Sequence, residues 1–340
     1  MSFLQDILQN RKKSMILIVV AAIVLALLIP SLAGNQFILN LTVMIFIYAL
    51  LASSWNIIGG YAGQLSTGHA AYFGIGAYTV VLLNVRLGIS PWIGLPVAML
   101  LAATLAVLVG WPCFRLKGSF FTLSTIAVLG VLRVLAVNLT GLTFGSVGVS
   151  VPMTFGFANM LFSSKWAYLL ITGIALGCVL FFKHWMQNSK LGYYLVAIRE
   201  DQDAASSLGV NASRIKLISF AVSAAFTAVG GAIYAQFILY IDPVSVFSSN
   251  ISLQMVIMSV IGGLGTLWGP LLGAALMVPM DQLIRAYFGG RMQGMSLLIY
   301  SLILILVIRL MPRGIAPTVK DWVNKPNRSK KEEVGGASNE

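Results

Sequence analysis

The run FILNLTVMIFIYALLASSWNII, residues 37–58, contains no charged side chain. It is long enough to cross a bilayer as a helix, which takes about 20 residues. The composition of the whole chain agrees with this reading, because 58% of its residues are hydrophobic and 9% are charged, whereas about 25% of a soluble domain is charged. A soluble protein of 340 residues would need more polar side chains to cover its surface. The sequence therefore predicts an all-α, polytopic bundle of transmembrane helices.

Similar apolar runs recur along the chain and predict about ten membrane spans. Glycines interrupt the third, eighth and ninth runs, so broken helices are expected among them. Together the spans make up one membrane domain, residues 15–311. The predicted spans are residues 15–33, 37–58, 66–84, 91–112, 119–138, 166–183, 215–238, 251–268, 270–288 and 294–311.

The two ends of the chain outside this domain differ in character. Residues 1–14 space their apolar side chains like a short amphipathic helix on the inner leaflet, and a frayed terminus is the alternative. Residues 312–340 are polar and charged, a composition that predicts a disordered cytoplasmic tail.

The distribution of positive residues sets the orientation, because Lys and Arg are enriched on the cytoplasmic side of membrane proteins. With the N-terminus in the cytoplasm, 17 of the 22 Lys and Arg residues lie on that side, and Arg133 lies within a span. The reverse orientation would invert this asymmetry, so we expect a protein of the inner (plasma) membrane with both termini cytoplasmic. The same bias explains the net charge of +12 without a nucleic-acid partner. The residues left outside are Arg86, Lys165, Arg285 and Arg291.

Charge is concentrated in the stretch AIREDQDAASSLGVNASRIK, residues 197–216, within the predicted cytoplasmic loop 184–214. Before it, the chain has no Asp or Glu from residue 7 to residue 198. Acidic residues from Glu200 onward suit the positive end of a helix, and Gly209 can end that helix in a left-handed conformation. Asn211 can then cap the next helix. The pattern predicts a short helix on the cytoplasmic surface.

One face of this short helix is small and apolar. Ala204, Ala205 and Leu208 recur at helical spacing, which would allow a partner to approach closely. An ordinary solvated loop with one helical turn is the alternative, and the spacing alone does not separate the two.

The order Asp203-Ala204-Ala205-x-x-x-Gly209 resembles the E-A-A-x-x-x-G coupling motif of bacterial ABC importer permeases, with Asp in place of Glu. Four longer segments are similar, in order and spacing, to permeases for branched-chain amino acids, and most to the M-type of their two permease subunits. These matches extend over most of residues 55–315. The segments are residues 60–78 (GYAGQLSTGHAAYFGIGAY), 192–235, 260–274 (VIGGLGTLWGPLLGA) and 309–315 (RLMPRGI).

The resemblance implies a subunit of a larger transporter. In that family two permeases pair within the membrane lipid, two cytoplasmic ATPases that bind ATP and Mg drive them, and a periplasmic or lipid-anchored binding protein delivers the substrate. This chain would then be no enzyme and would bind no cofactor itself. Branched-chain amino acids (leucine, isoleucine and valine) are the implied substrates, with urea or another small solute as the alternative. The residues implied in coupling to the ATPase are Arg199, Glu200, Asp201, Asp203, Ala204, Ala205, Leu208 and Gly209.

Two glycine-rich breaks are candidates for the translocation path. Irregular backbone within a membrane is tolerated where it is buried or lines a cavity, and broken helices point their ends at substrates in many transporters. Close helix packing at the glycines is the alternative, and we prefer it for Gly74 and Gly76. His69 is more often a hydrogen-bonded structural residue than a ligand, and with His184 on a different span no metal site is predicted. The path candidates are Gly63, Gln64, Ser66, Thr67, His69, Gly262, Gly263 and Gly265.

An ion-coupled secondary transporter is the main rival function. Proton coupling usually needs acidic residues or His within the spans, but the later spans offer only Asp281, with Asp242 at a span edge. Arg133 is a functional candidate by its place in a span, although snorkelling to the outer surface explains it better. Cys113 and Cys178 suggest no disulfide framework. A channel or a membrane enzyme finds less support in these residues.

Overall fold

The computed structural model describes residues 36–114, 120–288, 301–302, 305, 309 and 314–318. The N-terminal segment 1–14 and the predicted span 15–33 lie outside these residues. Only isolated positions of the predicted span 294–311 are described, and of the predicted tail only 314–318.

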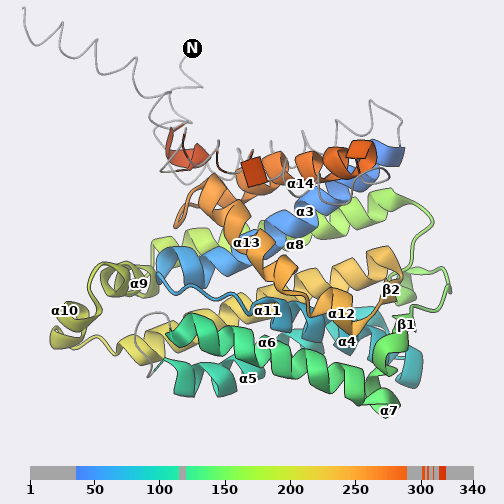
Figure 1. The fold of residues 1–340 in the computed structure, drawn as a ribbon, viewed down its shortest axis with the longest axis horizontal. Coiled ribbons are helices and arrows are strands. Elements are labelled where there is room, and N and C mark those ends of the chain that lie inside the picture. The colour runs from blue at the N-terminus through green and yellow to red at the C-terminus, as the bar shows by residue number, and fades with distance from the viewer. Residues whose placement is uncertain are drawn as a thin grey trace, which may run out of the picture.

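The described chain is a bundle of long helices whose axes run across the molecule, with short helices at both ends (Figure 1). Seven helical segments in the described part are long and apolar enough to cross a membrane, which confirms the all-α, polytopic fold class. The long helices are α3 (Gln36–Asn56), α4 (Ala70–Leu87), α5 (Pro91–Cys113), α6 (Phe120–Asn138), α8 (Lys165–Gln187), α11 (Ala212–Ile238), α13 (Ser249–Gly262) and α14 (Gly269–Phe288). The short helices are α7 (Thr140–Thr143), α9 (Lys190–Glu200), α10 (Gln202–Ser207) and α12 (Pro243–Val246).

Two predicted spans have wrong boundaries, and glycine-rich segments cause both errors. The predicted span 251–268 ends early, because α13 stops at Gly262 and Gly263 has a φ of 119°, outside helical geometry. The predicted span 66–84 begins late, because α4 starts at Ala70. Between α3 and α4 the chain forms a π-helix, η1 (Ile57–Tyr61), and then an irregular segment.

Helix α11 lies at the centre of the bundle and packs against α3, α4 and α5. Two glycines bring α11 and α4 into direct backbone contact. A Cβ atom on Gly76 would overlap the Ala228 carbonyl, and one on Gly231 would overlap the Phe73 carbonyl. Small residues allow such close approach between membrane helices, so Gly76 has the packing role that we prefer for it.

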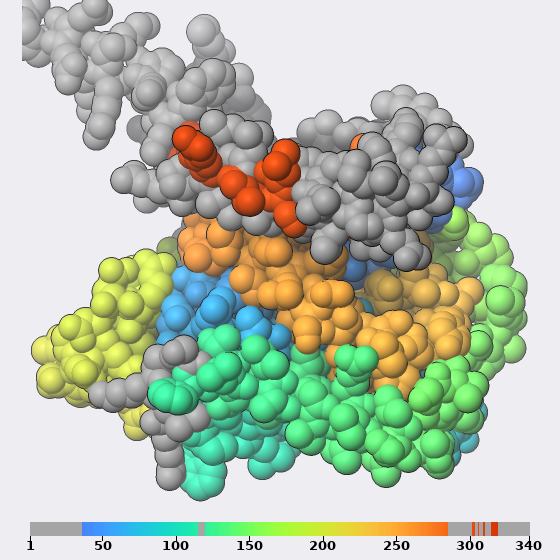
Figure 2. All heavy atoms as spheres, viewed as in Figure 1, coloured from blue at the N-terminus to red at the C-terminus, as the bar shows by residue number. Residues whose placement is uncertain are grey.

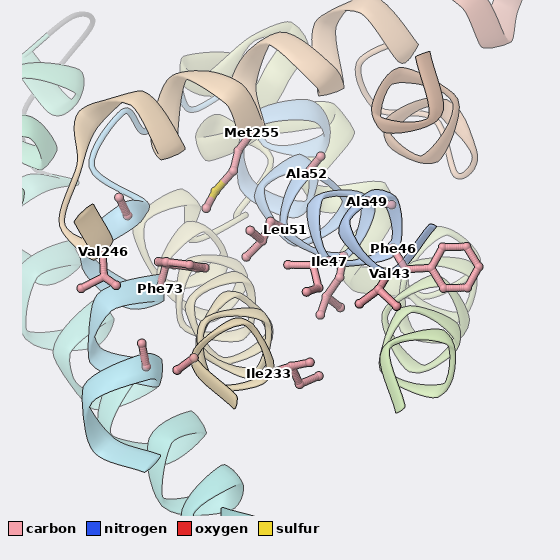
Figure 3. Packing of buried hydrophobic residues seen from close by; sticks show 14 of the residues in the cluster. Val43, Phe46, Ile47, Ala49, Leu51, Ala52, Phe73, Ile233, Val246 and Met255 are labelled. Carbon is pink, nitrogen blue, oxygen red and sulfur yellow. The ribbon is translucent and has the colours of Figure 1, made fainter. Parts of the chain in front are cut away.

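The main apolar core forms where α3 meets α11 and α13. This core includes Ile47 and Leu51 of α3, Ile233 of α11, Met255 of α13 and Phe73 of α4, which lie between these helices (Figure 3). All five side chains are at most 1% exposed. The core therefore joins helices that lie far apart in the sequence.

The connection between α6 and α8 pairs with the segment that follows α11. It contains two short 3₁₀ turns, η2 (Gly145–Val147) and η3 (Phe157–Asn159), and the strand β1 (Val149–Ser150). β1 pairs antiparallel with β2 (Tyr240–Ile241), which follows α11. This pairing closes the end of the bundle opposite to α9 and α10 (Figure 1).

Candidate functional site

The predicted coupling segment is a pair of helices that projects from one end of the bundle (Figure 1). α9 was not expected, and Glu200 is its last residue rather than the start of the short helix. Asp201 caps α10 by accepting hydrogen bonds from the N–H groups of Asp203 and Ala204, each at 2.9 Å. Gly209 follows α10 with a φ of 89°, and Asn211 caps α11, as the sequence predicts.

The small apolar face of α10 is divided between the protein interior and the surface. Ala205 is 4% exposed and packs in a small cluster with Ile198 and Ala212. Ala204 is exposed, and Leu208 is 87% exposed. Ala205 therefore holds α10 against its neighbours, while Ala204 and Leu208 are available to a partner.

Arg199, at the end of α9, reaches toward the bundle as well as along the surface. Its guanidinium forms an ion pair with Glu200 at 2.8 Å. Its Nη1 atom also donates a hydrogen bond to the Gly60 carbonyl at 3.1 Å. The side chain thus connects the coupling segment to the π-helix that ends α3.

Two irregular segments meet at this end of the bundle. We call residues 57–69 the first break and residues 263–268 the second break. Asn56 joins them, because its Nδ2 donates to the Thr266 carbonyl and its Oδ1 accepts from the Gly265 N–H, both at 3.0 Å. A Cβ atom on Gly60 would lie only 2.5 Å from the Gly265 nitrogen. The sequence shows that the two breaks are alike, but not that they touch.

Lys183, the last residue of the predicted span 166–183, is a site residue that its place in the sequence did not single out. In the structure it is 0% exposed, and its Nζ donates to the carbonyls of Thr266 at 3.2 Å and Leu267 at 3.1 Å. The side chain of Gln187, one helical turn further along α8, donates to the Tyr61 hydroxyl. The end of α8 is therefore hydrogen-bonded to both breaks.

His69 is the centre of a buried hydrogen-bond network at the start of α4. Its two ring nitrogens lie 2.8 Å from the hydroxyls of Ser66 and Ser223. The Ser223 hydroxyl donates to the Ser54 carbonyl at 2.7 Å, and Trp55 Nε1 donates to the Ser66 carbonyl at 2.6 Å. Ser66 and His69 are both 0% exposed, so they fix the end of the first break rather than face an open space.

The middle of the first break is open to the outside of this chain. Gly63 is exposed, Leu65 is 46% exposed, and Gln64 and Thr67 are half-buried. Its hydrogen bonds to neighbouring elements include the one that the Thr122 hydroxyl donates to the Leu65 carbonyl at 2.8 Å. Figure 2 shows the end of α3 and the following segment on this face, between the α9–α10 pair and α6.

The second break is packed on one side and open on another. Gly262 and Gly263 are buried and Gly265 is half-buried, whereas Leu264 is 45% exposed. Residues 314–318, from the predicted tail, form a helical turn against this break, where Pro317 lies next to Gly263. Of the path candidates, Gly63 in the first break is therefore exposed, and those of the second break are buried or half-buried.

The match to known proteins covers most of the chain. Residues 37–308 match the model of the family described as "Branched-chain amino acid transport system / permease component". The chain belongs to this family.

Relatives of this permease include both named subunit types. It is 29% identical to the high-affinity branched-chain amino acid transport system permease protein LivM of Escherichia coli K12, over 93% of this chain and 78% of the relative. It is 25% identical to LivH of Salmonella typhimurium, over 79% of this chain and 90% of the relative. A probable branched-chain amino acid transport permease protein LivM of Methanocaldococcus jannaschii is 22% identical, over 85% of this chain and 96% of the relative. No solved structure matches.

The remaining charged candidates of the permease have other surroundings. Asp242 caps α12, accepting from the N–H groups of Val244 and Ser245 at 2.9 Å. Arg133 is exposed near the end of α6. No group of three potential metal ligands occurs among the described residues. The polar residues that converge within the described bundle are thus those around the two breaks.

Proposed function

We propose that this permease is the M-type membrane subunit of an ABC importer for branched-chain amino acids. The observation that carries the proposal is the alignment to LivM, which has a higher identity and a longer coverage of this chain than the alignment to LivH. Similarity to both types also supports pairing with a second, LivH-like permease, because such relatives can form a pseudo-symmetric pair. A binding protein outside the cell would deliver the substrate.

Two cytoplasmic ATPases would drive the transporter through α10. This helix projects from the bundle and offers Asp203, Ala204 and Leu208 on its exposed side. In the proposed complex the exposed Ala204 and the 87% exposed Leu208 would enter a groove on the ATPase. In this arrangement the ATPases bind ATP and Mg, and the permease supplies the surface on which they act.

The translocation path would run along the face that exposes the first break. Lipid cannot hydrogen-bond the backbone N–H and C=O groups of an irregular segment, so such a segment is placed against protein or water. The exposed Gly63 and Leu65 lie on this face, together with the half-buried Gln64 and Thr67. A path between this face and the second permease would satisfy the requirement. Within it, Gln64 and Thr67 are the polar side chains closest to the substrate.

Uptake in a deletion strain tests the substrate. Cells that lack the gene are complemented with it, and labelled leucine and labelled urea are compared as substrates, with and without depletion of ATP. We expect ATP-dependent leucine uptake, competed by isoleucine and valine. Urea uptake alone would assign the chain to another branch of the superfamily, and leucine uptake that persists without ATP would contradict the importer.

A matched pair of variants tests α10 as the ATPase-binding helix. Leu208→Glu places a charge at the exposed end of α10, and Val147→Glu places one on a side chain that is 80% exposed at the opposite end. We expect Leu208→Glu to reduce co-purification of the ATPase at least tenfold and Val147→Glu to preserve it. Equal ATPase recovery with both variants would rule out docking at α10.

A further inference from the structure

We propose that Arg199 is a positioning residue that ties both breaks to α9, so that movement of the α9–α10 pair shifts the two breaks together. This inference rests on the proposed function, in which an ATPase moves α10. It assigns Arg199 a role inside the permease rather than at the ATPase surface.

Arg199 contacts both breaks with different parts of one side chain. Its Nη1 donates to the Gly60 carbonyl at 3.1 Å. Its Cγ would lie 2.7 Å from a Cβ atom on Gly63, and its Nη1 would lie 2.9 Å from one on Gly265. Gly63 and Gly265 have φ values of 66° and 68°, which favour glycine. The guanidinium therefore fits a site formed by three glycines from two distant parts of the chain.

The helices that carry Arg199 are joined to the predicted ATPase contact. Ile198, next to Arg199, packs with Ala205 of α10 and Ala212 of α11. Asp201 caps α10 directly after α9 ends. Close-packed elements transmit displacement because they cannot deform continuously. A displacement of α10 is thus passed to α9 and to the base of the Arg199 side chain.

Beyond Arg199, each break leads into a membrane helix. The first break continues to His69 and α4, and the second continues to α14. Asn56, directly before the first break, hydrogen-bonds Gly265 and Thr266 of the second, and Gly60 packs closely against the Gly265 nitrogen. A shift at Gly60 is therefore shared with Gly265, and the starts of α4 and α14 can respond together.

The bond from Arg199 to Gly60 can be kept while α9 moves. The Arg199 side chain is 36% exposed and has Glu200, the next residue of α9, as a second partner. A guanidinium has five N–H donors in a fixed plane, so it can hold a carbonyl and a carboxylate at once. Arg199 therefore holds the Gly60 carbonyl of the first break and a carboxylate of α9 at the same time.

The coupling ratio, ATP hydrolysed per leucine transported, tests this role in the assembled transporter. Arg199→Ala is compared with Arg214→Ala, which removes an exposed cation from the start of α11. We expect Arg199→Ala to bind the ATPase normally and to raise the ratio at least fivefold, because hydrolysis continues while the breaks no longer follow α9. Arg214→Ala should keep the wild-type ratio, and Arg199→Lys should recover part of the transport.

A double-mutant cycle gives a second readout on folded protein. Gly63→Ala brings a methyl group against the Arg199 stem, so we expect it to reduce uptake at least threefold more in the wild-type background than in Arg199→Ala. Equal effects in both backgrounds, or an unchanged coupling ratio in Arg199→Ala, would overturn the inference. Loss of ATPase binding in Arg199→Ala would also overturn the inference, because it would show that Arg199 belongs to the ATPase-binding surface. That result would still support the proposed importer function.

Discussion

The first and second breaks leave the bundle at the same end, but their backbones are held in different ways. The second break is short, and the buried Lys183 donates to two of its carbonyls. The first break is fixed at Gly60 by Arg199 and at His69 by two serine hydroxyls. Between these two points its backbone remains open on one face of the chain.

This difference separates two ways of holding irregular backbone. Pulling the second break away from Lys183 would leave its carbonyls without donors, which costs about 1–3 kcal/mol for each group. In the first break Gly63 and Leu65 are exposed, whereas Ser66 and Gly68 beyond them are buried. We therefore expect the backbone of residues 63–65 to change conformation most in the transport cycle, while the second break shifts with it and keeps its own conformation.

The largest effect is expected from Gly262→Ala, directly before the second break. A Cβ atom there would overlap the Gly269 carbonyl, which is backbone and cannot turn away. We expect the free energy of unfolding to fall by about 3 kcal/mol, measured as a lower unfolding temperature in detergent and lower abundance in membranes. Gly130→Ala in α6 is the control, because a Cβ atom on Gly130 meets nothing within 4 Å. Equal stability of the two variants would show that close backbone packing at Gly262 does not hold the second break.

A smaller loss is expected from Lys183→Met. This change takes the ammonium donor away from the carbonyls of Thr266 and Leu267, although relief of the buried charge offsets part of the cost. We expect a net destabilisation of about 1–2 kcal/mol by thermal unfolding in detergent. Lys190→Met, at an exposed position, should change stability by less than about 0.5 kcal/mol. If Lys183→Met were as stable as the wild type, the conformation of the second break would not depend on the Lys183 ammonium group.

The smallest effect on stability is expected from Thr67→Val in the first break. The Thr67 hydroxyl has no hydrogen-bond partner in the part of the chain that the structure describes. Because this oxygen is buried without a partner, an apolar side chain of the same shape should leave stability equal or higher, whereas the KM for leucine uptake should rise severalfold, since Thr67 lies on the proposed path. Thr104→Val on the exposed side of α5 is the control. An unchanged KM would exclude Thr67 from the path.

Local signals in the sequence account for most of the helix boundaries. The predicted spans 91–112 and 119–138 correspond to α5 (Pro91–Cys113) and α6 (Phe120–Asn138) within a residue at each end. The signals there are a proline at the start and polar or charged residues at the end. The span 251–268 failed because its apolar composition continues past Gly262, and hydropathy does not record a change in backbone angle.

The site was predicted only in part, because its contacts join distant segments. The cap at Asn211 and the left-handed Gly209 follow from neighbouring residues, and both were predicted. The bonds from Asn56 to residues 265–266 join positions about 210 residues apart, and Lys183 of α8 donates to the same segment. Helical spacing also cannot show that Ala205 faces inward while Ala204 faces outward. An Asn within an apolar run, three residues before the pair Gly59-Gly60, was the available signal for Asn56.

The helical turn at residues 314–318 sets the order in which this end of the molecule can be completed. Gly314 lies against the backbone of Gly262 and Gly263, and ribosomes make these residues after all the helices that they cover. Chains fold from their N-terminus during synthesis. Residues 263–268 are therefore made before residues 314–318 and stay uncovered until that later segment has been translated. A nascent chain cut short before Gly314 would leave the membrane helices inserted but the second break unsealed, a natural point for quality-control proteases to act.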